Sequence, residues 1–232
     1  MAKKKRPFKK SSRFVHEDPW RVFRIMSEFV EGLDEMSHIG RAVTIFGSAR
    51  TKPRDRYYKA TVDISRRLAE NNYAVITGGG PGIMEAANRG AAEGGGRSVG
   101  LNIKLPFEQS GNKYSNISVD FHYFFARKVC LAKYSTAFIY MPGGFGTMDE
   151  LFEILTLVQT RKVPRYPIIC FGRSYWSGLL KWANSTLKRG KYISPNDTDL
   201  VTITDSPAKA VQIINDYHNR AGDQTSPPPA FS

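Results

Sequence analysis

Short apolar runs alternate with segments of helical periodicity along most of this chain. The run at 137–141 is followed, after a glycine-rich turn, by apolar residues at the i, i+3, i+4 and i+7 positions of one helix face, namely Leu151, Ile154, Leu155 and Val158. Short strands that are apolar on both faces and alternate with helices are typical of a parallel sheet covered on both sides. The pattern therefore predicts an α/β fold with a doubly wound parallel sheet, helices on both faces, and a single domain.

The same pattern assigns the elements along the chain. Helices are expected directly after the glycine-rich turns at 78–82 and 142–146, and also at 18–37, 53–72, 126–135, 174–190 and 206–221. Strands are expected before both turns, and also at 41–50, 97–104, 117–125, 166–172 and 200–206. The domain would then span 18–221, with a basic disordered tail at 1–17 and a disordered Pro-rich tail at 222–232.

The composition argues against a membrane-spanning or secreted protein. Among the 232 residues no apolar run approaches the roughly 20 needed to cross a bilayer, and the N-terminus lacks the apolar stretch of a secretory signal. The two cysteines, Cys130 and Cys170, lie in apolar segments without a second Cys or a His at metal-binding spacing. We interpret them as buried thiols of a reducing compartment, which predicts a cytoplasmic protein with no membrane partner.

The positive charge is unevenly distributed. The net charge is +13, and residues 1–13 carry seven basic residues and no acid, which leaves +6 for the rest. We interpret this stretch as a solvated basic arm. Contact with nucleic acid or another anionic surface is the alternative.

Three expected strands end in turns that contain glycine, with the sequences FGSAR, TGGGPGIME and PGGFGT. The carboxyl ends of parallel strands meet at one edge of the sheet, so the three turns are predicted to converge there. Backbone amides at a helix N-terminus, with glycines that let a ligand approach, form a phosphate site. The turn GGGPGIM lacks the Lys-Ser/Thr that a P-loop needs, and no G-x-G-x-x-G motif opens the first helix. A ligand with one phosphate and one sugar therefore fits better than a nucleoside triphosphate or a dinucleotide.

The third turn supplies the main candidate residues. The expected phosphate cradle comprises Gly143, Gly144, Gly146 and Thr147, with Thr147 acting either as a helix cap or as a phosphate ligand. Asp149 and Glu150 are expected in the first helical turn, where acids stabilise the helix dipole. Glu150 lies about one turn past Gly146, so it can instead reach beyond the phosphate to the sugar.

A second candidate pair follows an aromatic strand end, in the segment FHYFFARK. Arg127 and Lys128 stand at a strand-to-helix junction on the ligand edge, where they can pair with the phosphate or with Glu150. A solvated pair at a helix start is the alternative, and it suits Lys128 better than Arg127 because cations are not the preferred charge at a helix N-terminus.

Three motifs of the chain occur together in one known family. PGGFGTMDE matches the motif P-G-G-x-G-T-x-x-E, and the block GGGPGIMEAANRGA and the Arg-Lys pair 15 residues before Pro142 match as well. From about Val43 to Lys162 the chain resembles the LONELY GUY family, the cytokinin riboside 5′-monophosphate phosphoribohydrolases, in its longer bacterial form. Such proteins have also been called possible lysine decarboxylases, a label that does not suit a chain without a pyridoxal-phosphate lysine context.

The resemblance implies a Rossmann-like homodimer or higher homo-oligomer. It also implies cleavage of the N-glycosidic bond of a cytokinin or purine nucleoside 5′-monophosphate to free base and ribose 5-phosphate, with no cofactor and no metal. Arg127 and Glu150 would be the catalytic pair. The phosphate site would be the four cradle residues together with Gly79, Gly80 and Gly82 of the facing loop. Further substrate contacts are expected from Ser48, Lys128, Glu85, Glu153 and Met141.

The chemistry of this cleavage assigns roles to the acids and to the arginine. Glu150 is expected to stabilise an oxocarbenium-like sugar or to activate water. Arg127 stays charged at any working pH, so it would orient groups and stabilise charge rather than carry a proton. Glu85 and Glu153 are candidates to protonate the leaving base, and ordinary surface acids are the alternative.

Other functions and other bases stay open. A noncatalytic nucleotide sensor or carrier on the same fold is the first alternative, although a pure binder has no need of Glu150 beside an anion. Nucleic-acid binding by the tail predicts that deleting residues 1–13 abolishes function, whereas a hydrolase would keep nearly all of its turnover. The base is open because Ala126 departs from the acidic or amide residue of plant members, and because a loop with Asn102, Glu108 and Tyr114 is expected to shape the base pocket.

Overall fold

The computed structural model describes residues 18–104 and 111–221. In this part of the chain, seven parallel strands form one sheet in the order β4-β3-β2-β1-β5-β6-β7. The strands are β1 (Ala42–Phe46), β2 (Ala74–Thr77), β3 (Ser98–Ile103), β4 (Ile117–Phe121), β5 (Ala137–Tyr140), β6 (Ile168–Phe171) and β7 (Val201–Thr204). The predicted doubly wound parallel sheet is confirmed.

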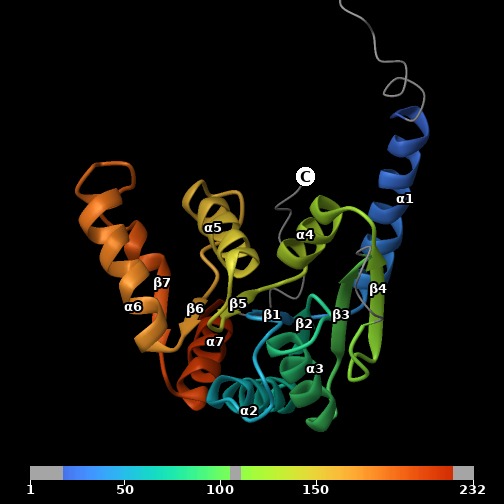
Figure 1. The fold of residues 1–232 in the computed structure, drawn as a ribbon, viewed down its shortest axis with the longest axis horizontal. Coiled ribbons are helices and arrows are strands. Elements are labelled where there is room, and N and C mark those ends of the chain that lie inside the picture. The colour runs from blue at the N-terminus through green and yellow to red at the C-terminus, as the bar shows by residue number, and fades with distance from the viewer. Residues whose placement is uncertain (1–17, 105–110, 222–232) are drawn as a thin grey trace, which may run out of the picture.

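Helices cover both faces of the sheet (Figure 1). One face carries α1 (Asp18–Ser37), α4 (Phe124–Lys133), α5 (Phe145–Gln159) and α6 (Arg173–Trp182), and the other carries α2 (Arg56–Glu70), α3 (Ile83–Glu93) and α7 (Pro207–Ala221). Alternate residues of each central strand supply the two cores. In β5, Phe138 and Tyr140 belong to the first core, and Ala137 and Ile139 to the second. This double burial explains why the strands are apolar at nearly every position.

The order of the strands reverses at β1, in the middle of the sheet. Val43 of β1 pairs with Val75 of β2 on one side and with Ala137 of β5 on the other. In open α/β sheets, ligands bind beyond the carboxyl ends of the strands at such a switch point. The turns after β1, β2 and β5 all leave the sheet at this place.

Local sequence signals explain several element boundaries. α2 begins where the Asp55 carboxylate accepts a hydrogen bond from the Tyr57 amide (2.7 Å). α7 begins where Ser206 Oγ accepts from the Lys209 amide (3.3 Å), which confirms the predicted cap. Both cysteines are buried, as expected. Within the described ranges, the helices lack the combination of length and apolar character that crossing a bilayer requires.

Two predicted elements end at other residues than expected. The strand predicted at 117–125 stops at Phe121, because the Glu28 carboxylate of α1 accepts hydrogen bonds from the amides of His122 (2.9 Å) and Tyr123 (3.1 Å) and α4 then begins at Phe124. The helix predicted at 174–190 is α6 followed by a π-helix at Ala183–Lys188, and a 3-10 helix at Asp197–Leu200 precedes β7. The predicted tails and Glu108 lie outside the described residues.

Candidate active site

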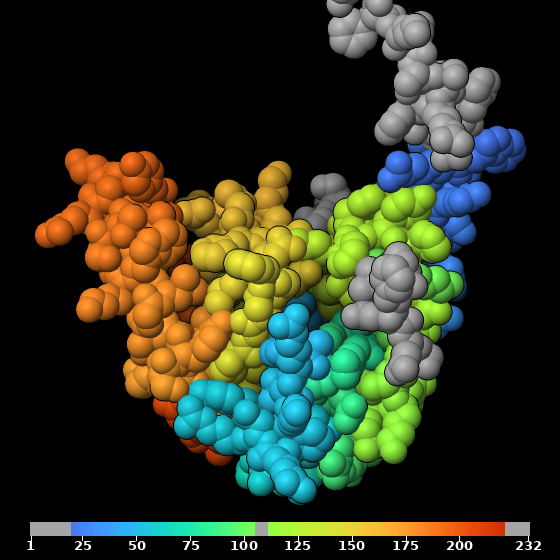
Figure 2. Space-filling view, viewed as in Figure 1, coloured from blue at the N-terminus to red at the C-terminus, as the bar shows by residue number. Residues whose placement is uncertain are grey.

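Backbone hydrogen bonds join the three glycine-containing turns. The Ser48 amide after β1 donates to the Pro142 carbonyl after β5 (3.1 Å), and the Ser48 carbonyl accepts from the Ile83 amide at the start of α3 (3.0 Å). The turns therefore converge, as the sequence predicts. Figure 2 shows the cyan surface of the segment after β1 beside the yellow surface of the segment that opens α5. The Ser48 hydroxyl accepts from the Arg50 amide (3.1 Å), so it also stabilises its own turn.

The turn after β5 leaves an open space in front of α5. Gly144 is the N-cap of α5, in an extended conformation with φ −93° and ψ −156°. A Cβ atom added at Gly144 or at Gly146 would meet nothing within 4 Å, whereas one added at Gly143 would collide with the Thr147 hydroxyl. The first amides of a helix have no intrahelical acceptor, so an anion can bind in this space.

The start of α5 corrects two expectations. Because Gly144 is the N-cap, Thr147 is the third helical residue and does not cap the helix; its side chain is buried. Asp149 and Glu150 then fall in the second turn instead of the first. Stabilisation of the helix dipole fades beyond the first turn, so it does not account for these two acids.

Asn112 holds the turn after β2 in place. Its side-chain amide donates to the carbonyls of Gly79 (3.0 Å) and Gly80 (3.2 Å), and its backbone amide donates to the Gly79 carbonyl (2.8 Å). Gly82 in the same turn has φ +69°, and a side chain there would collide with the Ser48 carbonyl. Sequence reasoning missed Asn112, because its contact with Gly79 joins positions 33 residues apart and leaves no local signal.

Glu150 belongs to a cluster of charged side chains between α4 and α5. Lys128 Nζ lies 2.8 Å from Asp149 Oδ2 and 3.0 Å from Glu153 Oε2. Glu150 itself is only 8% exposed. Lys128 therefore links α4 to α5 through ion pairs with Asp149 and Glu153, one residue before and three residues after Glu150. It is not a solvated cation at a helix start.

The pKa values of both Glu150 and Lys128 are raised in this cluster. Burial raises the pKa of Glu150 to about 7, against the opposing charge of Lys128, while Glu153 raises it further and Arg127 lowers it. Burial lowers the pKa of Lys128, but its hydrogen bonds to Asp149 and Glu153 outweigh burial and raise that pKa overall. Glu150 is thus a buried carboxyl that exchanges its proton near physiological pH, which is typical of catalytic acids and bases.

Arg127 extends from α4 toward the turn after β2. Its Nη1 lies 3.4 Å from the position that a Cβ on Gly78 would occupy, and its Cζ lies 5.2 Å from the centre of the Phe124 ring. Its charge also acts on Glu150. The structure therefore brings Arg127 near both the glycine turns and the buried carboxyl.

Two of the expected contact residues are engaged elsewhere. The Tyr58 hydroxyl donates to Glu85 Oε1 (2.8 Å), and burial together with this bond raises the pKa of Tyr58 to about 12. Tyr58, like Asn112, was not among the expected site residues. Met141 is fully buried in the core under α2, α3 and α7, so its side chain packs there instead of facing a ligand.

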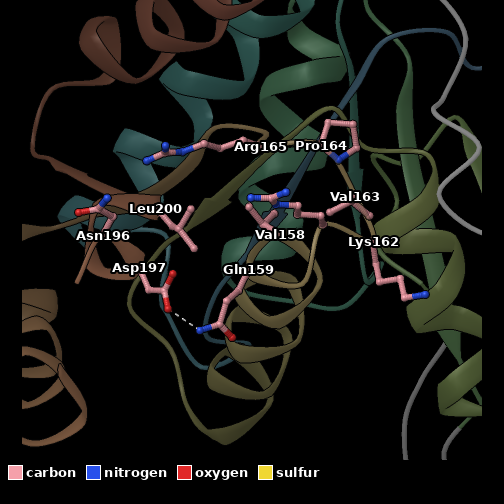
Figure 3. A pocket seen from close by; sticks show the side chains of 10 residues that line it. Val158, Gln159, Lys162, Val163, Pro164, Arg165, Asn196, Asp197 and Leu200 are labelled. Carbon is pink, nitrogen blue, oxygen red and sulfur yellow. Dashed lines mark hydrogen bonds between the residues drawn. The ribbon is translucent and has the colours of Figure 1, made fainter. Parts of the chain in front are cut away.

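A cavity lies at the other end of α5. It has a volume of about 590 Å³ and is lined by Gln159, Lys162, Arg165 and Asp197, among others (Figure 3). Gln159 Nε2 donates to Asp197 Oδ2 across it (2.5 Å). α5 has 15 residues, so at about 1.5 Å per residue this cavity is roughly 20 Å from the glycine turn. None of the expected site residues lines it.

The fold defines a Rossmann-like α/β protein whose glycine-containing turns converge at the switch point of its sheet. The family model described as "Possible lysine decarboxylase" matches residues 84–214, and the chain belongs to this family. Curated relatives bear out the LONELY GUY resemblance. Cytokinin riboside 5′-monophosphate phosphoribohydrolase LOG3 of Arabidopsis thaliana is 27% identical over 182 residues, 76% of this chain and 83% of the relative. LOG4 of the same plant is 28% identical over 188 residues, 79% of this chain and 85% of the relative.

Solved structures share the fold. The X-ray structure of the protein TM1055 aligns with a TM-score of 0.58 and 26% identity, covering 76% of this chain and 99% of that one. The molybdenum cofactor carrier protein of Chlamydomonas reinhardtii aligns with a TM-score of 0.57 and 22% identity, covering 76% of this chain and 96% of that one. The second likeness concerns the fold alone.

Proposed function

We propose that this chain hydrolyses the N-glycosidic bond of a purine or cytokinin nucleoside 5′-monophosphate, such as AMP. Water is consumed, and the free base and ribose 5-phosphate are released. The observation that carries the proposal is Glu150, a carboxyl that is 8% exposed and has a pKa of about 7, behind an open helix N-terminus. The names of the curated relatives support the same reaction.

The substrate phosphate binds at the N-terminus of α5. The amides that follow Gly144 and the space above Gly146 receive it, and the loop with Gly79, Gly80 and Gly82 closes the opposite side. Glu150 lies five residues beyond Phe145, or about 7.5 Å along the helix axis. It therefore faces the sugar and leaves the phosphate to the amides.

Glu150 acts as the carboxylate of the cleavage step. Once ionised it stabilises the positive charge that develops on the sugar, or accepts a proton from the attacking water. Arg127 carries a permanent charge and orients the phosphate or the carboxylate. Lys128 keeps Asp149 and Glu153 paired, so their charges repel the anionic substrate less.

Amine chemistry at Lys128 is not part of the proposal. A lysine that forms a Schiff base needs a lowered pKa and a free amine. Lys128 has a raised pKa and two carboxylate partners within 3.0 Å. This opposes a Schiff-base role for Lys128.

The test is an assay for free base. Purified protein is incubated with AMP, with isopentenyladenosine 5′-monophosphate and with adenosine, and the products are separated by chromatography. The proposal predicts release from a monophosphate and none from adenosine, which lacks the phosphate. If no base is released from any of them while AMP still binds, the chain is the noncatalytic nucleotide binder that its sequence leaves open.

We further propose that the reaction takes place in the cytoplasm. Cys130 and Cys170 are free and buried thiols, which is the usual state of cysteine in a reducing compartment. Fractionation of the native cells with an antibody against the chain tests this, and recovery outside the cytoplasmic fraction would contradict it.

A further inference from the structure

The segment 154–196 concentrates positive charge. It carries eight basic residues and no acid, whereas the rest of the chain beyond residue 13 has a net charge of −2. The segment runs from within α5 through β6, α6 and the π-helix. A surface that carries charge of one sign attracts ligands of the opposite sign. An anion that approaches the protein is therefore drawn toward this segment.

The cavity at the C-terminal end of α5 lies in this segment and combines positive charge with an apolar lining. Its basic lining residues are Arg161, Lys162 and Arg165, and its apolar lining includes Val158, Val163 and Leu200. In Figure 3 the Arg165 side chain extends along one side of the cavity toward Asn196. The volume of about 590 Å³ is in the range of cavities that hold small organic molecules.

The acid that lines the cavity does not neutralise these basic residues. Asp197 Oδ2 accepts a hydrogen bond from Gln159 Nε2 (2.5 Å) and forms no ion pair with a lining residue. Among residues 18–104 and 111–221, the side chains of Arg161 and Lys162 have no ion-pair or hydrogen-bond partner. Arg165 donates there to a backbone carbonyl (3.3 Å). The positive charges at the cavity are thus available to an anionic ligand.

Arg161 has a backbone conformation that favours glycine, with φ +57°. Its amide donates to the Val158 carbonyl (3.1 Å), and the Lys162 amide donates to the Leu157 carbonyl (2.9 Å). In this helix-ending pattern glycine is the usual residue. A side chain there is strained, and such strain is typical of functional positions. A cation also stabilises the C-terminal end of a helix, but Lys162 supplies that charge at the next position without the strain.

We propose that this cavity binds an organic phosphate, meaning a phosphate monoester of an aromatic or other apolar group. The guanidinium groups of Arg161 and Arg165 receive the phosphate, because guanidinium forms paired hydrogen bonds with phosphate oxygens. A phosphate monoester carries nearly two negative charges at pH 7, which suits two arginines better than a carboxylate does. The apolar lining receives the organic part. The site is independent of the glycine turns and of the reaction proposed for them.

Arginine footprinting of the full-length protein tests the location. Phenylglyoxal modifies accessible guanidinium groups, and peptide mass spectrometry measures the modification at each position. The probe is phenyl phosphate, which has no glycosidic bond. At about ten times its Kd it is expected to slow the modification of Arg161 and Arg165 about tenfold. Arg173, which is exposed on α6, should react unchanged. Arg127 reports separately on the glycine turns, so the two sites can fail independently.

The affinity of the cavity is measured from the protection of Arg165 at increasing probe concentrations. Phenyl phosphate is expected to bind about tenfold more tightly than inorganic phosphate, because only its ring buries apolar surface. Arg161→Asn removes the guanidinium but keeps a residue that tolerates the left-handed conformation, and it is expected to weaken binding about tenfold. Lys181→Met removes an exposed charge of the same segment outside the cavity and should leave the Kd unchanged.

Arg161→Gly separates the ligand from the fold. Glycine adopts φ +57° without strain, so this variant is expected to raise the Tm by about 2–4 °C while it weakens binding. Asn72→Gly, at another left-handed residue with φ +63°, is the matched control. It should not lower the Tm and should leave binding unchanged.

Several results would overturn the proposal. They are unprotected Arg161 and Arg165, equal protection of Arg173, or unchanged binding in Arg161→Asn. Equal affinity for phenyl phosphate and inorganic phosphate would also overturn it, because it would show a general attraction for anions instead of a site for an organic phosphate.

Discussion

At Glu150, burial and the charges of nearby basic residues act on the carboxyl in opposite directions. Its carboxyl is removed from water between α4 and α5, which favours the proton, while Lys128 and Arg127 favour the ionised form. The balance leaves it half ionised near pH 7. Its activity and its contribution to stability should both depend on pH in that region.

The pH dependence of the rate follows from the ionised role of Glu150. If the carboxylate is the active form, kcat/KM for a nucleoside 5′-monophosphate rises with pH through about 7, where the pKa of Glu150 lies, and levels off above it. Steady-state kinetics from about pH 5 to pH 9 measure this. A profile that is flat, or that falls through pH 7, would contradict the assignment.

The same pKa makes Glu150 costly to the fold at high pH. Its folded pKa of about 7 is above the ordinary 4.5, so the native state binds the proton more tightly than the unfolded state. Stability therefore falls as pH rises from 4.5 to 7 and stays lower above it. Glu150→Gln is expected to raise the free energy of unfolding at pH 8 by up to roughly 3 kcal/mol. Urea unfolding should show this gain shrinking toward pH 4.5, and equal stability of both proteins at pH 8 would refute it.

Lys128 has a separate and measurable role. Its charge lowers the pKa of Glu150, so Lys128→Met is expected to move the rise of the rate profile to higher pH. Lys133→Met removes the same charge from the same helix, without the ion pairs to Asp149 and Glu153, and should leave the profile in place. An unshifted profile in Lys128→Met would mean that the ion pairs matter only for packing.

At the level of elements, two glycines near the start of α5 are expected to have different roles. Gly143 is required for the packing of the turn, and Gly146 leaves space for the phosphate. Gly143→Ala forces a collision with Thr147 and is expected to cost about 1–3 kcal/mol of stability. Gly146→Ala meets nothing in the protein, so it should keep or slightly raise stability while narrowing the space for the phosphate and raising KM. Thermal unfolding measures the stability of the two variants, and steady-state kinetics measures their KM. If both variants lose the same stability and show the same KM, the phosphate does not bind at this turn.

Apolar periodicity was sufficient to predict the sheet and most helices. The central strands bury both faces, so strands such as β5 and β6 appear as continuous apolar runs. The element boundaries that were predicted wrongly depend on contacts that the local sequence does not reveal. β4 ends where Glu28, 94 residues away from His122, takes over its amides, and only the backbone at Gly144 decides that α5 begins at Phe145.

The location of the candidate site could be predicted from the sequence, but its side-chain contacts could not. Glycine turns at strand ends must meet at one edge, and this identified the region of Ser48, Gly82 and Gly143. The partners of individual side chains could not be inferred. Lys128 pairs with acids 21 and 25 positions away, and Asn112 holds a turn from a different loop.

For the whole molecule, the reversal of strand order at β1 concentrates function at one edge. Turns from β1, β2 and β5 are bonded to one another there, and α4 brings Arg127 and Lys128 to the same place. The large cavity at the far end of α5 contains none of these groups. We propose that a nucleoside monophosphate binds at this edge and is cleaved with the help of Glu150.

The most direct test compares cleavage and binding in one pair of variants. Glu150→Gln and Asp149→Asn each neutralise one acid of α5, and base release from the preferred monophosphate is followed under single-turnover conditions, with ribose 5-phosphate binding measured alongside. We expect Glu150→Gln to bind the sugar phosphate normally and to release base about 100-fold more slowly or worse, while Asp149→Asn stays close to the native rate. Base release by Glu150→Gln at the native rate would contradict it.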